Sequence, residues 1–216
     1  MKINEIFWSV QGEGRYIGHP AIFIRTYVCH LVDRGIGCEW CDTPHSWTGD
    51  NFKEMTPEII AKVIECYPTK HIVLTGGEPY LQQDLKDVVT YLKNKDYFIE
   101  IETTGDCNFK RYHPIQQYNI SPKYQQCVLH WNIDFHYEDD TILKFVYDGS
   151  GATEDFIATV IKTNDCKKEN VYIMPECRTR EQYYQMMAPT VNYCKKTGYV
   201  FAPRLHIINW GNKKGV

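Results

Sequence analysis

The sequence predicts an α/β fold, specifically a partial and irregular (β/α) barrel with fewer helices than strands. Six short runs are rich in β-branched or aromatic residues, which is typical of strands, and they cover residues 21–25, 71–75, 97–102, 118–121, 142–147 and 171–174. Helical patterns separate several of these runs, and this alternation favours parallel strands joined by right-handed crossovers. No repeat or linker divides the 216 residues, so we expect one domain spanning residues 1–216.

Three helices are predicted in the gaps between the strand-like runs. The first begins after Thr56, with Pro57 at the first helical position, and an amphipathic pattern follows. The second is expected over residues 81–93. The third begins near Thr153, where acidic residues precede a new apolar pattern.

A fourth helix is predicted near the C-terminal end of the chain. It begins at Thr179, and Gln182 follows at the spacing of a capping box. We expect Pro189 to kink or break this helix. Residues 105–117 and 123–141 carry no convincing helical pattern, which is why fewer helices than strands are expected.

The composition excludes several classes of protein. Lys plus Arg is 24 and Asp plus Glu is 27, so the net charge is −3 and no large basic field is available to bind nucleic acid directly. No apolar run suits a bilayer span or a signal peptide, so we expect a cytoplasmic protein with no membrane partner. Nine cysteines, an odd number, then indicate metal ligands or free thiols, and we expect Cys66 and Cys194 to be buried in helices.

Three of the cysteines form a cluster directly after the first strand-like run. Cys29, Cys38 and Cys41 have the spacing C-x8-C-x2-C. A structural zinc ion needs a fourth ligand, which His30 or His45 could supply, whereas an iron–sulfur cube held by three cysteines leaves one iron open. The spacing alone leaves both alternatives open.

A glycine pair follows the second strand-like run, in the segment Thr75-Gly76-Gly77-Glu78-Pro79. Two glycines allow a ligand to approach the backbone closely, and a neighbouring carboxylate can hold a cationic amine. The alternative is a strand-to-helix turn, with Glu78 favoured by the helix dipole and Pro79 in the first helical turn.

Further short motifs keep a fixed order along almost the whole chain. They are Phe7-Trp8-Ser9-Val10-Gln11-Gly12-Glu13-Gly14, Phe23-Ile24-Arg25, Cys38-Glu39-Trp40-Cys41-Asp42-Thr43, Glu102-Thr103-Thr104-Gly105, Ser121-Pro122-Lys123, Met174-Pro175-Glu176, Ala202-Pro203-Arg204-Leu205-His206 and Trp210-Gly211. With the cysteines and the glycine pair, these motifs resemble the radical S-adenosylmethionine (SAM) superfamily and, within it, the 7-carboxy-7-deazaguanine synthase (QueE) family.

The resemblance implies a radical SAM core with two cofactors. It implies that Cys29, Cys38 and Cys41 bind three irons of a 4Fe–4S cluster whose open iron binds SAM. The residues that the resemblance assigns to SAM are Trp40, Gly77, Glu78, Ser121, Pro122, Lys123, Met174, Pro175 and Glu176. No catalytic side chain is expected beyond the radical that the cofactors supply.

The same resemblance implies a ring-contracting lyase of deazapurine biosynthesis, of the queuosine or archaeosine type. Its substrate is 6-carboxy-5,6,7,8-tetrahydropterin, its product is 7-carboxy-7-deazaguanine, and ammonia is lost. The residues implied in substrate binding are Val10, Gln11, Gly12, Glu13, Arg25, Thr75, His206 and Val216, the last through a C-terminal segment over about 203–216. Thr43 is implied as a ligand of Mg²⁺. His206 is the weaker of these assignments, because a lone histidine in a strand-like run is more often a buried structural residue than a ligand.

The sequence departs from the family pattern at two points. The common cysteine spacing is C-x3-C-x2-C, so residues 32–37 form an insertion to which we assign no role. Lys213 and Lys214 stand where an arginine is common, and lysine supplies charge without a planar fork.

By resemblance we expect a homodimer and a flavodoxin-like reductant. Two alternatives remain open from the residues: a glycyl-radical-enzyme activating protein, which would not need Gln11 or Arg25, and a non-catalytic zinc-binding module.

Overall fold

The computed structural model describes residues 1–33, 35, 38, 41–105, 109–123, 138–211 and 213–216. Trp40 and part of the insertion over residues 32–37 lie outside the described residues. The strands are β1 (Lys2–Val10), β2 (Pro20–Thr26), β3 (Lys53–Glu54), β4 (His71–Gly76), β5 (Phe98–Thr103), β6 (Gln117–Ile120), β7 (Thr141–Tyr147), β8 (Val171–Pro175) and β9 (Val200–Phe201). The helices are α1 (His30–Asp33), α2 (Pro57–Ile64), α3 (Leu85–Lys93), α5 (Gly151–Asn164), α6 (Arg180–Thr197) and α7 (Leu205–Trp210).

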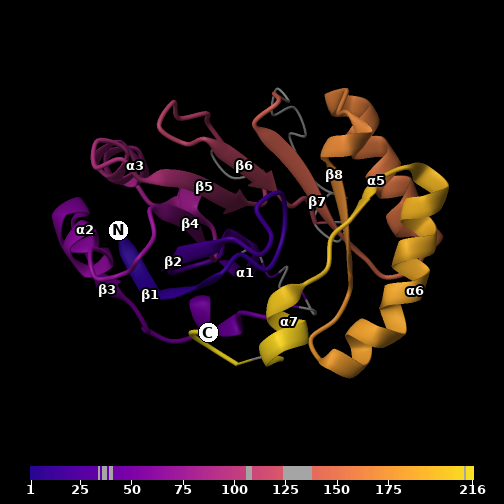
Figure 1. Cartoon of the computed structure of the whole chain (residues 1–216), viewed down its shortest axis with the longest axis horizontal. Helices are drawn as coiled ribbons and strands as arrows, with labels where there is room; N and C mark the ends of the chain where they lie inside the picture. The colour runs from indigo at the N-terminus through magenta and orange to yellow at the C-terminus, as the bar shows by residue number, and fades with distance from the viewer. Residues whose placement is uncertain (34, 36–37, 39–40, 106–108, 124–137, 212) are drawn as a thin grey trace.

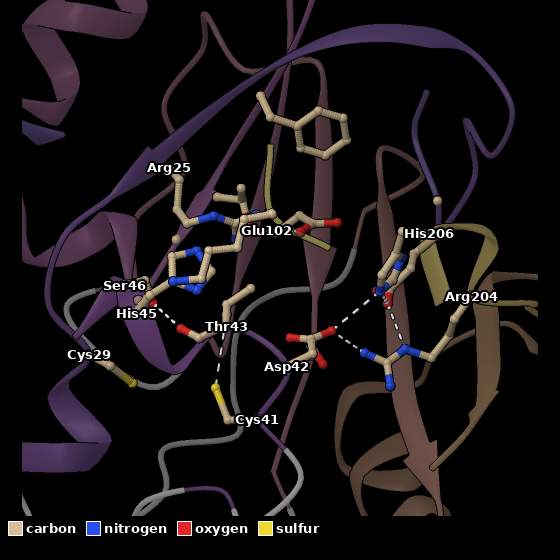
Figure 2. A pocket seen from close by; sticks show the side chains of 18 of the residues that line it. Arg25, Cys29, Cys41, Asp42, Thr43, His45, Ser46, Glu102, Arg204 and His206 are labelled. Carbon is tan, nitrogen blue, oxygen red and sulfur yellow. Dashed lines mark hydrogen bonds and ion pairs between the residues drawn. The ribbon is translucent and has the colours of Figure 1, made fainter. Parts of the chain in front are cut away.

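The described strands form one curved sheet in the order β3-β1-β2-β4-β5-β6-β7-β8-β9. β1 pairs antiparallel with β2 and β3, whereas β2 and β4 to β9 run parallel in chain order. Figure 1 shows α2 and α3 beside one half of the sheet and α5 and α6 beside the other. The edge strands β3 and β9 do not pair with each other, so the sheet is an open barrel, as predicted. Side chains at the carboxyl ends of its parallel strands line a cavity (Figure 2).

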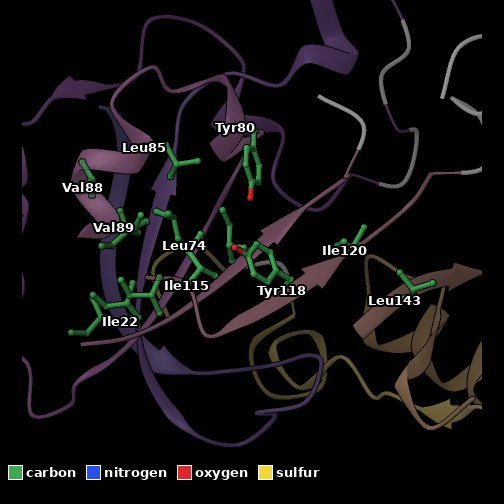
Figure 3. Close-up of a cluster of buried hydrophobic side chains, with 14 of the residues drawn as sticks. Ile22, Leu74, Tyr80, Leu85, Val88, Val89, Ile115, Tyr118, Ile120 and Leu143 are labelled. Atoms are coloured by element: carbon green, nitrogen blue, oxygen red, sulfur yellow. The ribbon is translucent and has the colours of Figure 1, made fainter. Parts of the chain in front are cut away.

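The main core lies between the sheet and its helices. The strands that read as continuous apolar runs are buried on both faces; in β4, for example, Ile72, Val73 and Leu74 are fully buried. Figure 3 shows side chains of the sheet packed against those of α3, such as Val88 and Val89. This packing fixes the strands whose ends carry the cavity.

All six predicted strands are confirmed, and so are the four predicted helices. The second helix begins later than predicted, at Leu85, because residues 79–81 form a separate 3₁₀ turn. Three strands escaped prediction: β1, β3 and β9. Two smaller predictions were wrong, since His206 lies in the short helix α7 and not in a strand, and Cys66 is exposed just after α2. Cys194 is buried in α6, as predicted.

Pro189 lies inside α6 without breaking it, so of the predicted kink or break the break is wrong, and the kink stays a prediction. Proline removes the N–H that would bond the carbonyl of Gln185, four residues earlier. Pro189 and Gln185 are both exposed, so the carbonyl that lacks its helical donor lies on the solvent side. The capping box at Thr179 and Gln182 is present, as predicted.

Within the described residues, the structure contains no helix that is long and apolar enough to cross a membrane.

A matched pair of isoleucines tests the assignment of the core. Ile72→Ala in the fully buried β4 should lower the free energy of unfolding by about 2–5 kcal/mol, because it leaves a cavity in close-packed surroundings. Ile59→Ala on the exposed side of α2, where Ile59 is 48% exposed, should change it by less than about 0.5 kcal/mol. Urea denaturation of both variants measures the difference, and equal losses would contradict the assignment.

Candidate active site

The cavity lies at the carboxyl-end edge of the parallel sheet. Neighbouring strands bring polar side chains to the same level, since Arg25 of β2 pairs in register with Thr75 of β4. Glu102 of β5 and Lys144 of β7 line the same cavity. The loop after β1, the cysteine loop and the last four residues of the chain complete the wall.

The three clustered cysteines all line this cavity, as Figure 2 shows for Cys29 and Cys41. Each is partly buried. Burial raises the pKa of Cys29 to about 11. Its thiol therefore keeps its proton at neutral pH until a metal displaces it.

The loop between the first two cysteines begins with buried residues. Leu31 of α1 is 2% exposed and lines the cavity, and His30 is also buried. The loop between the first two cysteines therefore begins by forming cavity wall at Leu31, whereas Gly35 further along it is exposed.

The glycine pair packs against the cysteine loop. A Cβ at Gly77 would lie 1.9 Å from the carbonyl oxygen of Val28, and a Cβ at Gly76 would lie 2.4 Å from backbone atoms of Thr26. The amide of Glu78 donates to the carbonyl of Val28 at 2.9 Å. Both glycines line the cavity, so the close backbone approach that they permit brings the turn and the cysteine loop together.

The side chain of Glu78 does not line the cavity. It is fully buried and accepts hydrogen bonds from the amides of Tyr80 (3.2 Å) and Thr104 (3.0 Å) and from the hydroxyls of Thr103 (2.7 Å) and Thr104 (2.9 Å). Burial raises the pKa of Glu78 despite these donors. The carboxylate therefore ties the glycine turn to the end of β5, and it also caps the 3₁₀ turn, as the turn alternative predicts.

The other residues assigned to SAM divide into two groups. Ser121, Lys123 and Met174 line the cavity, and Lys123 Nζ donates to Ser121 Oγ at 2.6 Å. Burial lowers the pKa of Lys123. Pro122, Pro175 and Glu176 are not among the residues that line the cavity.

All eight residues implied in substrate binding line the same cavity, although they come from five separate segments. Gln11 is 2% exposed, and both ends of its amide are engaged: Nε2 donates to Glu100, and Oε1 accepts from the amide of Glu13 at 3.2 Å. Gly12 packs on α7, since a Cβ there would lie 2.6 Å from His206 Nδ1. Gln11 thus shapes the loop that carries Glu13.

Charged groups are paired across the cavity wall. Arg204 is 4% exposed; its Nε donates to Glu13 Oε1 at 3.0 Å, and its Nη2 donates to Asp42. His206 Nε2 lies 3.3 Å from Asp42 Oδ2 (Figure 2). Burial by itself raises the pKa of Asp42, but the guanidinium of Arg204 outweighs this and the pKa is lowered.

Ligand atoms of Glu13, Asp42 and His206 lie within 4.8 Å of one another, a spacing that suits a metal ion. Arg204 already supplies a positive charge to both carboxylates of this group. Next to it, Thr43 Oγ1 has Cys41 Sγ, at 3.9 Å, as its partner among the described residues, which leaves the hydroxyl oxygen open to a hard cation.

Arg25 is held by a second charged group. Its Nε donates to Glu5 Oε1 at 2.8 Å, and His45 Nε2 lies 3.1 Å from the same oxygen. Burial raises the pKa of Glu5, but Arg25 outweighs it, and the pKa is lowered. His45, one of the two histidines that could complete a zinc site, is thus engaged with Glu5.

Sequence reasoning gave no role to several charged residues of the cavity. They are Glu5, Asp42, Glu102, Lys144 and Arg204. The signal for two of them was available, because Glu102 and Lys144 interrupt apolar strands at positions that alternate with core residues.

Residues 26–175 match the family model of the Radical SAM superfamily. The chain therefore belongs to the radical SAM superfamily. Along almost its whole length it is similar to curated 7-carboxy-7-deazaguanine synthases. That of Pyrobaculum aerophilum is 29% identical over 227 residues (100% of this chain, 97% of the relative), and that of Halobacterium salinarum is 29% identical over 241 residues (98% and 91%). The crystal structure of QueE from Escherichia coli shares the fold, with a TM-score of 0.71 at 23% identity over 94% of this chain and 92% of that one.

Membership identifies the cofactors as a 4Fe–4S cluster and SAM. The described residues fit both, because three thiols and a glycine-lined backbone face one cavity. Chemistry of this superfamily also needs a small-molecule substrate and a reductant for the cluster.

The buried Glu78 gives a direct test of how the glycine turn is held. Glu78→Gln keeps the shape but turns one acceptor into an NH₂ group, which must face the amide of Tyr80 or Thr104. The free energy of unfolding should fall by about 1–3 kcal/mol and SAM should bind more weakly. Glu65→Gln, at an exposed position after α2, is the matched control and should change neither. If urea denaturation gave Glu78→Gln an unchanged free energy of unfolding, the proposed role of Glu78 in holding the glycine turn would be contradicted.

Proposed function

We propose that this protein acts as a 7-carboxy-7-deazaguanine synthase. It would convert 6-carboxy-5,6,7,8-tetrahydropterin to 7-carboxy-7-deazaguanine and ammonia. The observation that carries the proposal is one cavity lined by the cysteine loop, the glycine turn, the loop of residues 10–13 and the last residues of the chain. The curated synthases that resemble the chain along its whole length support the same reaction.

We propose that the cavity has a cofactor end and a substrate end. Cys29, Cys38 and Cys41 would hold the cluster, with Gly77 and Ser121 beside SAM. When bound, the cluster and SAM would supply a 5′-deoxyadenosyl radical for hydrogen abstraction at C6 of the substrate. The chain's own residues orient the ring and keep water from the radical.

Arg25 is the proposed partner of the substrate carboxylate. Its Nε is fixed by Glu5, and no described residue hydrogen-bonds its two Nη groups. A guanidinium held in this way presents a planar pair of donors that matches a carboxylate. The C-terminal carboxylate of Val216, which also lines the cavity, would accept from the amino edge of the pterin.

Thr43 is the proposed protein ligand of Mg²⁺. One hydroxyl is a weak magnesium site, so the substrate carboxylate and water must complete the six oxygens. Metal and substrate should therefore bind cooperatively. The ion would stabilise negative charge that develops during ring contraction.

We also propose a cytoplasmic homodimer that receives electrons from a flavodoxin-like protein. The described cysteines are all free thiols, in keeping with a reducing compartment.

Product analysis tests the function. After anaerobic reconstitution, the protein should show the broad brown absorption of the cluster and, with dithionite, SAM, Mg²⁺ and the tetrahydropterin, form 7-carboxy-7-deazaguanine by mass spectrometry. Cys29→Ala should lose both absorption and product, while Cys66→Ala, an exposed cysteine after α2, should keep both. A brown protein that cleaves SAM without forming this product would refute the proposal.

The guanidinium of Arg25 gives a second test of the proposed function. Arg25→Lys keeps the charge but loses the planar pair of donors and the bond from Nε to Glu5. The KM for the tetrahydropterin should rise by about tenfold or more, while cluster absorption and the Kd for SAM stay unchanged. Arg15→Lys, which replaces an arginine bonded to Asn170 outside the cavity, is the control. An unchanged KM for Arg25→Lys would remove Arg25 from substrate binding.

A further inference from the structure

Lys144 lies in the middle of β7 with its side chain buried inside the cavity wall. The residue is 2% exposed, and a lysine is almost never buried to this degree unless it is paired. Its Nζ donates to Glu102 Oε1 at 2.8 Å and to Glu13 Oε2 at 2.9 Å. The ammonium therefore bridges two carboxylates that line the proposed substrate end.

Each of the two carboxylates accepts a hydrogen bond from a second donor at its other oxygen. Thr75 Oγ1 donates to Glu102 Oε2 at 2.8 Å, and Arg204 Nε donates to Glu13 Oε1 at 3.0 Å. Lys144 thus joins the wall formed by β4 and β5 to the wall formed by the loop after β1 and the segment before α7. Among the described ion pairs, Glu102 pairs with Lys144 alone, so this ammonium is the charged link between the two walls.

The ammonium and the carboxylate of Glu13 stabilise each other's charge. Burial by itself lowers the pKa of Lys144, but Glu102 and Glu13 outweigh it and the pKa is raised, so the ammonium persists. Burial raises the pKa of Glu13, yet Lys144 and then Arg204 outweigh it and the pKa is lowered. His206 and Asp42 also face Glu13, with opposite and smaller effects.

We propose that Lys144 is a positioning residue that holds Glu13 and Glu102 as a fixed pair of anionic acceptors for the N–H groups of the substrate ring. The inference rests on the proposed function and deepens it, because it specifies which ligand chemistry the cavity recognises. That chemistry is a ring edge rich in N–H donors next to a carboxylate bound by Arg25. An ionised carboxylate only accepts hydrogen bonds, so the pair selects such an edge.

The test is Lys144→Met, which removes the charge and keeps an unbranched side chain. Without the ammonium, two partly buried carboxylates repel each other, and we expect one of them to take up a proton within the assay range. The KM for the tetrahydropterin should rise by about tenfold or more. The kcat/KM should gain an ascending limb between about pH 6 and pH 8 that the unchanged enzyme lacks, since activity recovers only as the carboxylate loses its proton.

Three further variants make the result decisive. Lys167→Met, at an exposed lysine that pairs with Asp139 at 2.8 Å outside the cavity, should behave as the unchanged enzyme. Lys144→Arg keeps the charge and should show no new limb in the pH profile. Glu102→Gln should raise the KM without creating the limb, so it tests the acceptor pair even if Lys144→Met does not fold.

The possible failures are distinguishable. If the unchanged enzyme makes no 7-carboxy-7-deazaguanine, the proposed function fails. If it makes the product, and Lys144→Met or Glu102→Gln leaves the KM and the pH profile unchanged, the inference about Lys144 fails alone. A higher KM for Lys144→Met with an unaltered pH profile would also overturn it, because a merely structural role gives that result.

Discussion

Charges that are buried inside the open barrel must be paired, and this constraint organises the whole site. A chain of ion pairs runs from Glu102 through Lys144, Glu13 and Arg204 to Asp42. Each link joins segments that are distant in the sequence, up to 191 residues apart for Arg204 and Glu13. Replacing such pairs with apolar residues often stabilises a protein, so their presence here is better explained by positioning than by stability.

Backbone contacts position the cofactor end of the cavity in a comparable way. Gly77 lies so close to Val28 that no side chain fits between the glycine turn and the cysteine loop, and Glu78 anchors the far side of the same turn to Thr103 and Thr104. The motif thus has two physical roles: its glycines permit the approach and its carboxylate fixes it. Through these hydrogen bonds, Glu78 holds the backbone of the turn that the motif predicts beside SAM.

The sequence was sufficient to predict the strands and helices that carry a strong local signal. Apolar runs such as that of β4 predicted the parallel strands, and cap residues such as Thr179 predicted helix starts. β3 and β9 have two residues each, and β1 is largely half-buried with mixed polarity, so none carried such a signal. The motifs identified the residues that line the cavity, but the partners of Lys144 lie 42 and 131 residues away, and pairing at that range is invisible in one sequence.

The same strands serve the core and the site because their side chains alternate between two faces. In β7, Leu143 and Phe145 belong to the hydrophobic core, and Lys144 between them points into the cavity; in β5, Ile99 and Ile101 pack in the core while Glu102 lines the site. A closed barrel fills its interior with bulky apolar layers, whereas this open one uses that face for charged groups. A shift of one residue in strand register would place the ammonium in the core and leucine in the cavity. The burial of the core residues therefore fixes the register that the site needs, so that the apolar face of each strand determines where its charged groups meet.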